Sequence, residues 1–173
     1  MTARAPARDA MAVLCEPLTV ARIAEQPVSF VFTVDLPCTP AQLFGVFEDP
    51  TSWPKWVPGI GEVIWTSARP YGVGTTRTVV FWGGTEVYEE FVAWDAPREM
   101  SFTFTGTSEA IWHAFGEHYL VDETENGCRL TWTVGYAPRD GFARAHPLIR
   151  PVMRLVLGSY MRLLKRYVRR NVR

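Results

Sequence analysis

The stretch HPLIRPVMRLVLGSYMRLLKRYVRRN, residues 146–171, decides the fold class, because the spacing of apolar residues along the chain changes there. Apolar residues recur here every three or four positions with arginines between them, which predicts an amphipathic α-helix. Pro147 and Pro151 stand near its start, where missing amide donors matter least. About 20 helical residues with a rise of about 1.5 Å each would span about 30 Å. Such a helix can lie across a whole sheet.

The chain before this helix predicts strands. VSFVFTVDL (28–36) is rich in Val and Phe and alternates, as the first strand would. Thr39 and Pro40 then begin a short helix, and the proline-rich DPTSWPKWVPG (49–59) predicts a second, tight helical turn. Six further segments have strand patterns: 61–67, 75–82, 85–94, 99–105, 111–121 and 128–136.

Gly83-Gly84 and ETENG (123–127) are hairpin signals between neighbouring strands. We therefore expect an α+β fold: an antiparallel meander of about seven strands, two short helices after the first strand, and the long C-terminal helix.

Length and charge limit the domain organisation. A chain of 173 residues with 47% apolar residues suits one domain with a sizeable core. Residues 1–26 have the pattern of an extension that is expected to be partly disordered, with one short helix between Ala10 and Ala24. Residues 27–173 form the single predicted domain.

The net charge is zero, yet no acidic residue follows Asp140, and nine of the eighteen Lys and Arg lie between Arg144 and Arg173.

Cysteines and apolar runs bear on the compartment. The three cysteines have no CxxC spacing, so neither a disulfide framework nor a zinc site is predicted. No signal peptide and no run of membrane-spanning length is recognised. We expect a cytoplasmic protein with reduced thiols, no metal and no cofactor.

Four stretches together resemble a known family. They are DPTSWPKWVPGI (49–60), RPYGVGTTRTV (69–79), EEFVAWDAPREMSF (89–102) and GCRLTW (127–132). With the predicted element order, they are similar to the polyketide cyclase/dehydrase and lipid-transport (SRPBCC) group of the START-like superfamily, over about residues 27–171. The resemblance implies a helix-grip fold, in which a curved sheet wraps the C-terminal helix and encloses a cavity for an apolar small molecule. It transfers no catalytic residue, because its motifs are mainly structural.

Polar side chains on one predicted strand face are the candidate reactive groups. In IWHAFGEHYLV (111–121), alternation places His113, Phe115, Glu117 and Tyr119 on one face and His118 on the other. The first face is the more apolar and is predicted to face inward. His113 and Glu117 are then candidates for acid–base catalysis, with Tyr119 orienting the substrate; alternatively they hydrogen-bond each other or a ligand without chemistry.

Further residues are candidates for the cavity wall. In the acidic strand 85–94, Tyr88 and Glu90 are predicted to face inward and Glu89 to meet solvent. Trp53 and Trp56 would form a lid, and residues of the C-terminal helix a floor. The candidate ligand-binding set is Glu90, Tyr119, Phe115, Tyr88, Trp53, Trp56, Met153, Val156, Leu157, Tyr160 and Leu164.

Three functions remain open at this point. The first is binding, transport or sequestration of an apolar or aromatic small molecule, lipid- or polyketide-like. The second is an aromatase/cyclase or dehydratase that uses His113 and Glu117. The third is an interaction or regulatory protein whose basic helix end contacts an anionic partner or membrane surface. We expect a monomer or homodimer, with no nucleic-acid partner.

Overall fold

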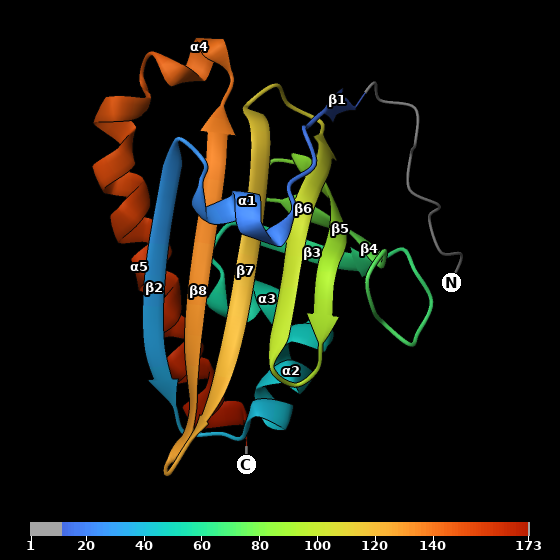
Figure 1. Cartoon of the computed structure of the whole chain (residues 1–173), viewed down its shortest axis with the longest axis vertical. Helices are drawn as coiled ribbons and strands as arrows, with labels where there is room; N and C mark the ends of the chain where they lie inside the picture. The colour runs from blue at the N-terminus through green and yellow to red at the C-terminus, as the bar shows by residue number, and fades with distance from the viewer. Residues whose placement is uncertain (1–11, 173) are drawn as a thin grey trace.

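A curved antiparallel sheet forms most of the protein (Figure 1). The computed structural model describes residues 12–172. The main path of the sheet has the order β2-β8-β7-β6-β5-β4-β3, so consecutive strands from β3 to β8 are neighbours and β2 joins β8. The strands on this path are β2 (Val28–Leu36), β3 (Ile60–Trp65), β4 (Thr76–Phe81), β5 (Glu86–Asp95), β6 (Glu99–Thr107), β7 (Trp112–Thr124) and β8 (Gly127–Pro138).

The helices lie on both faces and at one end of this sheet. They are α1 (Val20–Ala24), α2 (Pro40–Glu48), α3 (Trp53–Trp56), α4 (Asp140–Ala143) and α5 (His146–Asn171). Thr39 caps α2 in a capping box with Gln42, as its position before Pro40 predicts. The long helix α5 packs against β2 and α3. The predicted α+β helix-grip architecture is confirmed, with a curled sheet around a long C-terminal helix.

The segment before β2 covers the outer face of the sheet. β1 (Val13–Leu14) pairs with β6, and α1 lies across β7 and β8 (Figure 1). Leu18 and Ile23 are buried there against Ala114. Residues 12–26 are therefore part of the packed domain, and α1 is shorter than the helix expected between Ala10 and Ala24. The prediction of partial disorder covered residues 1–26, and of these residues 1–11 lie outside the described part of the chain.

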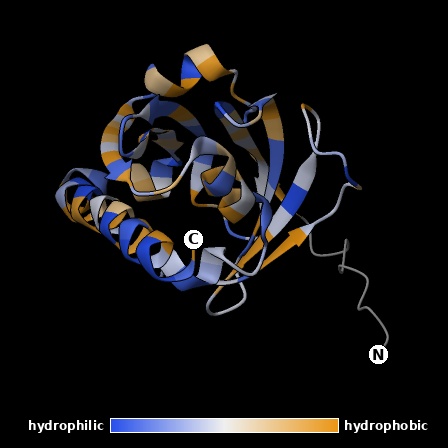
Figure 2. Ribbon diagram, turned by 90° about the horizontal axis from the view of Figure 1, so that it is seen from below, coloured by the Kyte–Doolittle hydropathy of each residue, from blue (hydrophilic) through white to orange (hydrophobic). Residues whose placement is uncertain are grey.

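The main core lies between the inner face of the sheet and helices α2, α3 and α5. Figure 2 shows α5 striped with apolar and polar residues along its length, as expected for a helix with one buried face. Leu157, Met161, Leu164 and Val168 form that buried face. Within residues 12–172, no helix is both long and apolar enough to cross a membrane.

Candidate ligand-binding cavity

A cavity of about 190 Å³ lies inside the core, between the inner face of the sheet, α3 and α5. Its wall is mostly aromatic and aliphatic, with three charged side chains. The lining residues are Trp53, Trp56, Val57, Ile60, Arg77, Val79, Phe81, Val87, Glu89, Phe102, Phe104, Trp112, Phe115, Glu117, Tyr119, Trp132, Met153, Leu157 and Tyr160. Ligand pockets typically have volumes of about 300–1,000 Å³, so this cavity favours a small occupant.

Arg77 and Glu89 form a buried ion pair in this wall. Arg77 Nε donates to Glu89 Oε2 from the neighbouring strand, and Arg77 is only 2% exposed. Burial raises the pKa of Glu89, and the Arg77 guanidinium opposes this rise. A buried pair must be well hydrogen-bonded to offset the loss of water around both charges, so the remaining donors of Arg77 matter.

Aromatic rings surround the Arg77 guanidinium. Its Cζ lies 4.3 Å from the ring centroid of Trp53 and 4.8 Å from that of Phe102, within the range of cation–π attraction. Rings stabilise the charge but accept no conventional hydrogen bond from Nη1. Among the described residues, Arg77 Nη1 is buried without a hydrogen-bond partner.

Trp56 supplies a second buried donor without a partner. Its Nε1 finds no acceptor within the described part of the chain, and its side chain is almost fully buried. The neighbouring Trp53 differs, because its Nε1 donates to the carbonyl of Phe47 at 2.9 Å. Buried donors are normally paired, so two unpaired N–H groups in one cavity wall indicate a place for an acceptor atom.

Glu117 is the third charged residue of the wall. Its Oε2 accepts hydrogen bonds from the Tyr119 hydroxyl and from Trp132 Nε1, the latter at 2.8 Å. Burial, followed by the charge of Glu89, raises the pKa of Glu117 to about 7, although both hydrogen bonds and Arg77 act in the opposite direction. Burial and the Glu117 carboxylate also raise the pKa of Tyr119. A carboxyl group with this pKa exchanges its proton near neutral pH.

His113 does not join Glu117. The pairing of β7 with β8 shifts register between Trp112 and Ala114, so His113 is an extra residue at a β-bulge. Trp112 and Phe115 both line the cavity, while His113 is 57% exposed and lies 3.2 Å from Glu16. The predicted inward position of His113 is wrong, because strict alternation does not continue through a bulge. Phe115, Glu117 and Tyr119 follow it on the inner face, where the prediction placed them.

The prediction that Glu90 faces inward and Glu89 faces solvent is wrong, because the structure has the two faces exchanged. Val87, Glu89 and Phe91 face the core, whereas Tyr88 and Glu90 lie on the other face and do not line the cavity. The Tyr88 hydroxyl donates to Glu86 at 2.7 Å on that face. A register shift between Phe91 and Ala93 lets Trp94 pack against the core, although simple alternation from Phe91 would place it on the other face. Trp94 therefore suggested the wrong face for the first half of β5.

Most of the other predicted wall residues reach the cavity. Trp53 and Trp56 do so from α3, and Met153, Leu157 and Tyr160 from α5. Leu164 is buried in the core but lies outside the wall, and Val156 is 42% exposed. These last two predictions are wrong in position, because α5 turns only a narrow face toward the cavity.

The sequence interpretation missed Arg77 and Glu89 as wall residues. Arg77 shares the face of Val79 and Phe81 by alternation, and this was the available signal. His118, on the outer face as predicted, bonds Glu99 at 2.9 Å. Within residues 12–172, no cluster of three His, Cys, Asp or Glu side chains has an arrangement suited to a metal ion.

A curved sheet that encloses a mostly apolar cavity with a long C-terminal helix defines the helix-grip class of ligand-binding folds. Residues 27–169 match the family described as polyketide cyclase/dehydrase and lipid transport, and the chain belongs to it. An uncharacterised protein of Mycobacterium tuberculosis is 40% identical over 153 residues, which are 88% of this chain and 92% of that protein. An uncharacterised protein of Mycobacterium bovis matches equally.

Solved structures share the fold at low sequence identity. A protein of Thermus thermophilus has a TM-score of 0.67 with 14% identity, over 84% of this chain and 100% of that one. The di-domain ARO/CYC StfQ from the steffimycin biosynthetic pathway has a TM-score of 0.65 with 11% identity, over 83% and 51%. Ara h 8.0201 has a TM-score of 0.60 with 19% identity, over 83% and 99%.

Proposed function

We propose that the protein binds a small aromatic or apolar molecule in this cavity, with an acceptor oxygen of the ligand placed against Arg77 and Trp56. The observation that supports this function is the pair of buried, unpartnered donors, Arg77 Nη1 and Trp56 Nε1, in an otherwise apolar wall. A ligand carbonyl, ether or carboxylate oxygen would satisfy donors that are costly to leave unpaired. The aromatic wall would stack on the body of the ligand.

The test compares two ligands of nearly equal shape. 2-Acetylnaphthalene carries a carbonyl oxygen, and 2-isopropenylnaphthalene replaces it with a methylene group. Isothermal titration calorimetry on the full chain is expected to show roughly tenfold tighter binding of the ketone, because a hydrogen bond to a charged donor contributes about 1.5–3 kcal/mol. Equal affinities for the two compounds, or binding of neither, would contradict the proposal.

Matched variants locate the acceptor site. Trp56→Phe removes the unpaired indole N–H and is expected to reduce the preference for the ketone. Trp53→Phe makes the same chemical change at a tryptophan whose N–H already has a partner, so it should keep the preference. Arg77→Met alone would leave Glu89 buried and unpaired, so it is combined with Glu89→Met, since apolar replacement of a whole buried pair is tolerated far better.

Acid–base catalysis is a second candidate function, and in this structure it would rest on Glu117 alone, without His113. Its specific support is a carboxyl group with a pKa of about 7 in the cavity, hydrogen-bonded to Tyr119. A polyketide-like or other carbonyl substrate bound at Arg77 could exchange a proton with Glu117. Turnover that persists in Glu117→Gln, with the ligand still bound, would eliminate this role.

A further inference from the structure

The first half of α5 exposes apolar side chains on the face that points away from the core. Leu148 is 83% and Leu155 73% exposed, and Val152 and Val156 are also exposed. These four residues, here called the outer apolar strip, recur at helical spacing and lie on the side of α5 opposite its buried residues. Exposed leucines on one face of a helix indicate a contact surface more than single scattered ones do.

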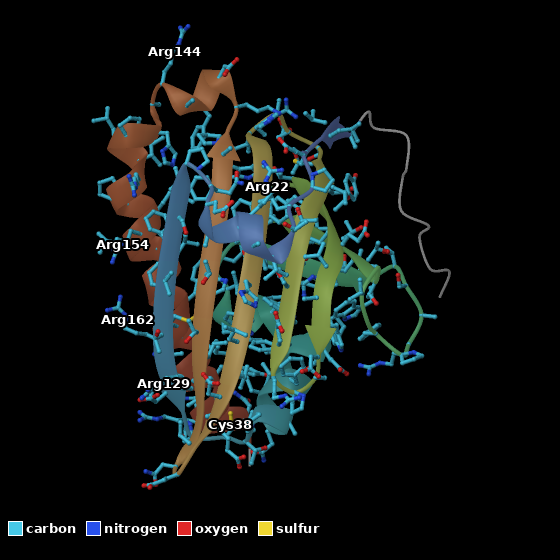
Figure 3. All side chains as sticks on the ribbon, in the orientation of Figure 1. Arg22, Cys38, Arg129, Arg144, Arg154 and Arg162 are labelled. Atoms are coloured by element: carbon cyan, nitrogen blue, oxygen red, sulfur yellow. The ribbon has the colours of Figure 1, made fainter. Side chains whose placement is uncertain are left out.

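Basic residues surround the outer apolar strip. Figure 3 shows Arg144 just before the start of α5, and Arg154 and Arg162 on α5 itself. The Arg154 guanidinium lies over the ring of Phe30 on β2. Arg166 and Arg170 continue the outward face in the second half of the helix by the same spacing. No acidic residue follows Asp140 to neutralise them. This surface is apolar in one half and cationic in the other, with cations at its flanks.

Charge decides between two kinds of occupant. If a second copy packed its α5 antiparallel along the full length of this one, the apolar half of each helix would meet the arginines of the other. Parallel packing would bring like charges together, which costs free energy. An anionic lipid bilayer has the complementary chemistry, because acyl chains accept the leucines and phosphate headgroups accept the arginines.

We propose that the outer apolar strip and its arginines dock the protein on an anionic membrane surface, with α5 lying in the plane of the bilayer. The same helical turns face the cavity on their inner side, through Met153, Leu157 and Tyr160. Docking therefore brings the α5 wall of the cavity next to the lipid phase, a source of apolar small molecules. This inference goes beyond ligand binding and does not depend on it.

The test measures flotation of the full chain with lipid vesicles. One set contains phosphatidylcholine alone and the other includes about a third phosphatidylglycerol. The chain is expected to float with the anionic vesicles, and less so as salt rises, because salt screens the arginines. Leu148→Ser combined with Leu155→Ser should weaken the partition about tenfold or more, since both changes remove apolar area from the bilayer.

A matched control uses the same chemistry elsewhere on the surface. Val31 on β2 and Val73 before β4 are 54% and 71% exposed, so Val31→Ser combined with Val73→Ser should leave flotation unchanged. Equal flotation of the two double variants, or no flotation of the wild type, would overturn the proposal. A dimer in light scattering that the strip variant alone dissolves, without vesicle binding, would assign the surface to a second copy. Flotation of Trp56→Phe separates docking from the cavity, because that variant should float like the wild type.

Discussion

Glu117 accepts two hydrogen bonds on one carboxylate oxygen and is buried in the cavity wall. The neutral carboxyl group loses much less hydration free energy on burial than the carboxylate does, and this explains why burial outweighs the two donors in setting the pKa. Glu89 is buried as well, but it has Arg77 as a direct partner. The carboxyl groups of Glu89 on β5 and Glu117 on β7 thus have different roles: the first neutralises a cation, and the second is free to change protonation near neutral pH.

The proton on Glu117 makes stability depend on pH. Its folded-state pKa of about 7 lies above the ordinary 4.5, so between these values the folded chain keeps a proton that the unfolded chain releases. The free energy of unfolding should fall as pH rises through this window, by roughly 3 kcal/mol, and then level off. Glu117→Gln should flatten this dependence in urea titrations, because its amide does not titrate.

The control for that series is Glu123→Gln, which changes an exposed carboxylate further along the same strand. It should retain the slope of the wild type. Burial also raises the pKa of Glu89, which remains in both variants, so only the difference between the slopes reports the contribution of Glu117. Equal slopes in the Glu117→Gln variant and the wild type would show that folding does not raise the pKa of Glu117.

At the scale of elements, the strands were predictable and their faces were not always so. Alternation and turn residues located β2 at its observed bounds and β7 within a few residues. Inward faces were right for Glu117 and Tyr119, where alternation is unbroken. They were wrong for His113 and Glu90, because each strand contains a register shift that local sequence does not mark. Arg77 was missed, because a buried cation is unexpected without knowledge of its partner.

A pair of glycines lets α1 lie close to the sheet. Gly116 and Gly135 are opposite each other on β7 and β8, and a Cβ on Gly135 would lie 1.7 Å from the carbonyl oxygen of Ile23. Gly135→Ala should therefore lift α1 and reduce the free energy of unfolding by about 2–4 kcal/mol, as Leu18 and Ile23 lose their packing. Chemical denaturation measures the loss.

Gly45→Ala is the matched control for this change. Gly45 lies within α2, and a Cβ there would meet no atom within 4 Å. Alanine is the better helix former by up to about 1 kcal/mol, so this variant should be neutral or slightly more stable. Similar destabilisation by both substitutions would mean that α1 does not depend on the glycine at Gly135.

For the whole molecule, the core and the candidate binding site occupy the same space. The core is continuous from α2 through the sheet to α5, and the cavity lies inside it. A cavity forfeits packing contacts that a filled core would have, so it costs stability. In this protein, ligand binding and maximal stability are therefore opposing demands on the same residues.

That opposition predicts a trade-off. Val79 and Val87 are cross-strand partners that line the cavity, so Val79→Ile combined with Val87→Ile places two methylene groups in it. Thermal and urea unfolding should show a gain of about 0.5–2 kcal/mol, while affinity for 2-acetylnaphthalene falls at least tenfold. Val121 and Val134 are buried in the same core but do not line the cavity. Replacing both by Ile should lower the free energy of unfolding by about 1–3 kcal/mol through overpacking. Equal losses of stability in both double variants would mean that the space near Val79 and Val87 is not available to a ligand.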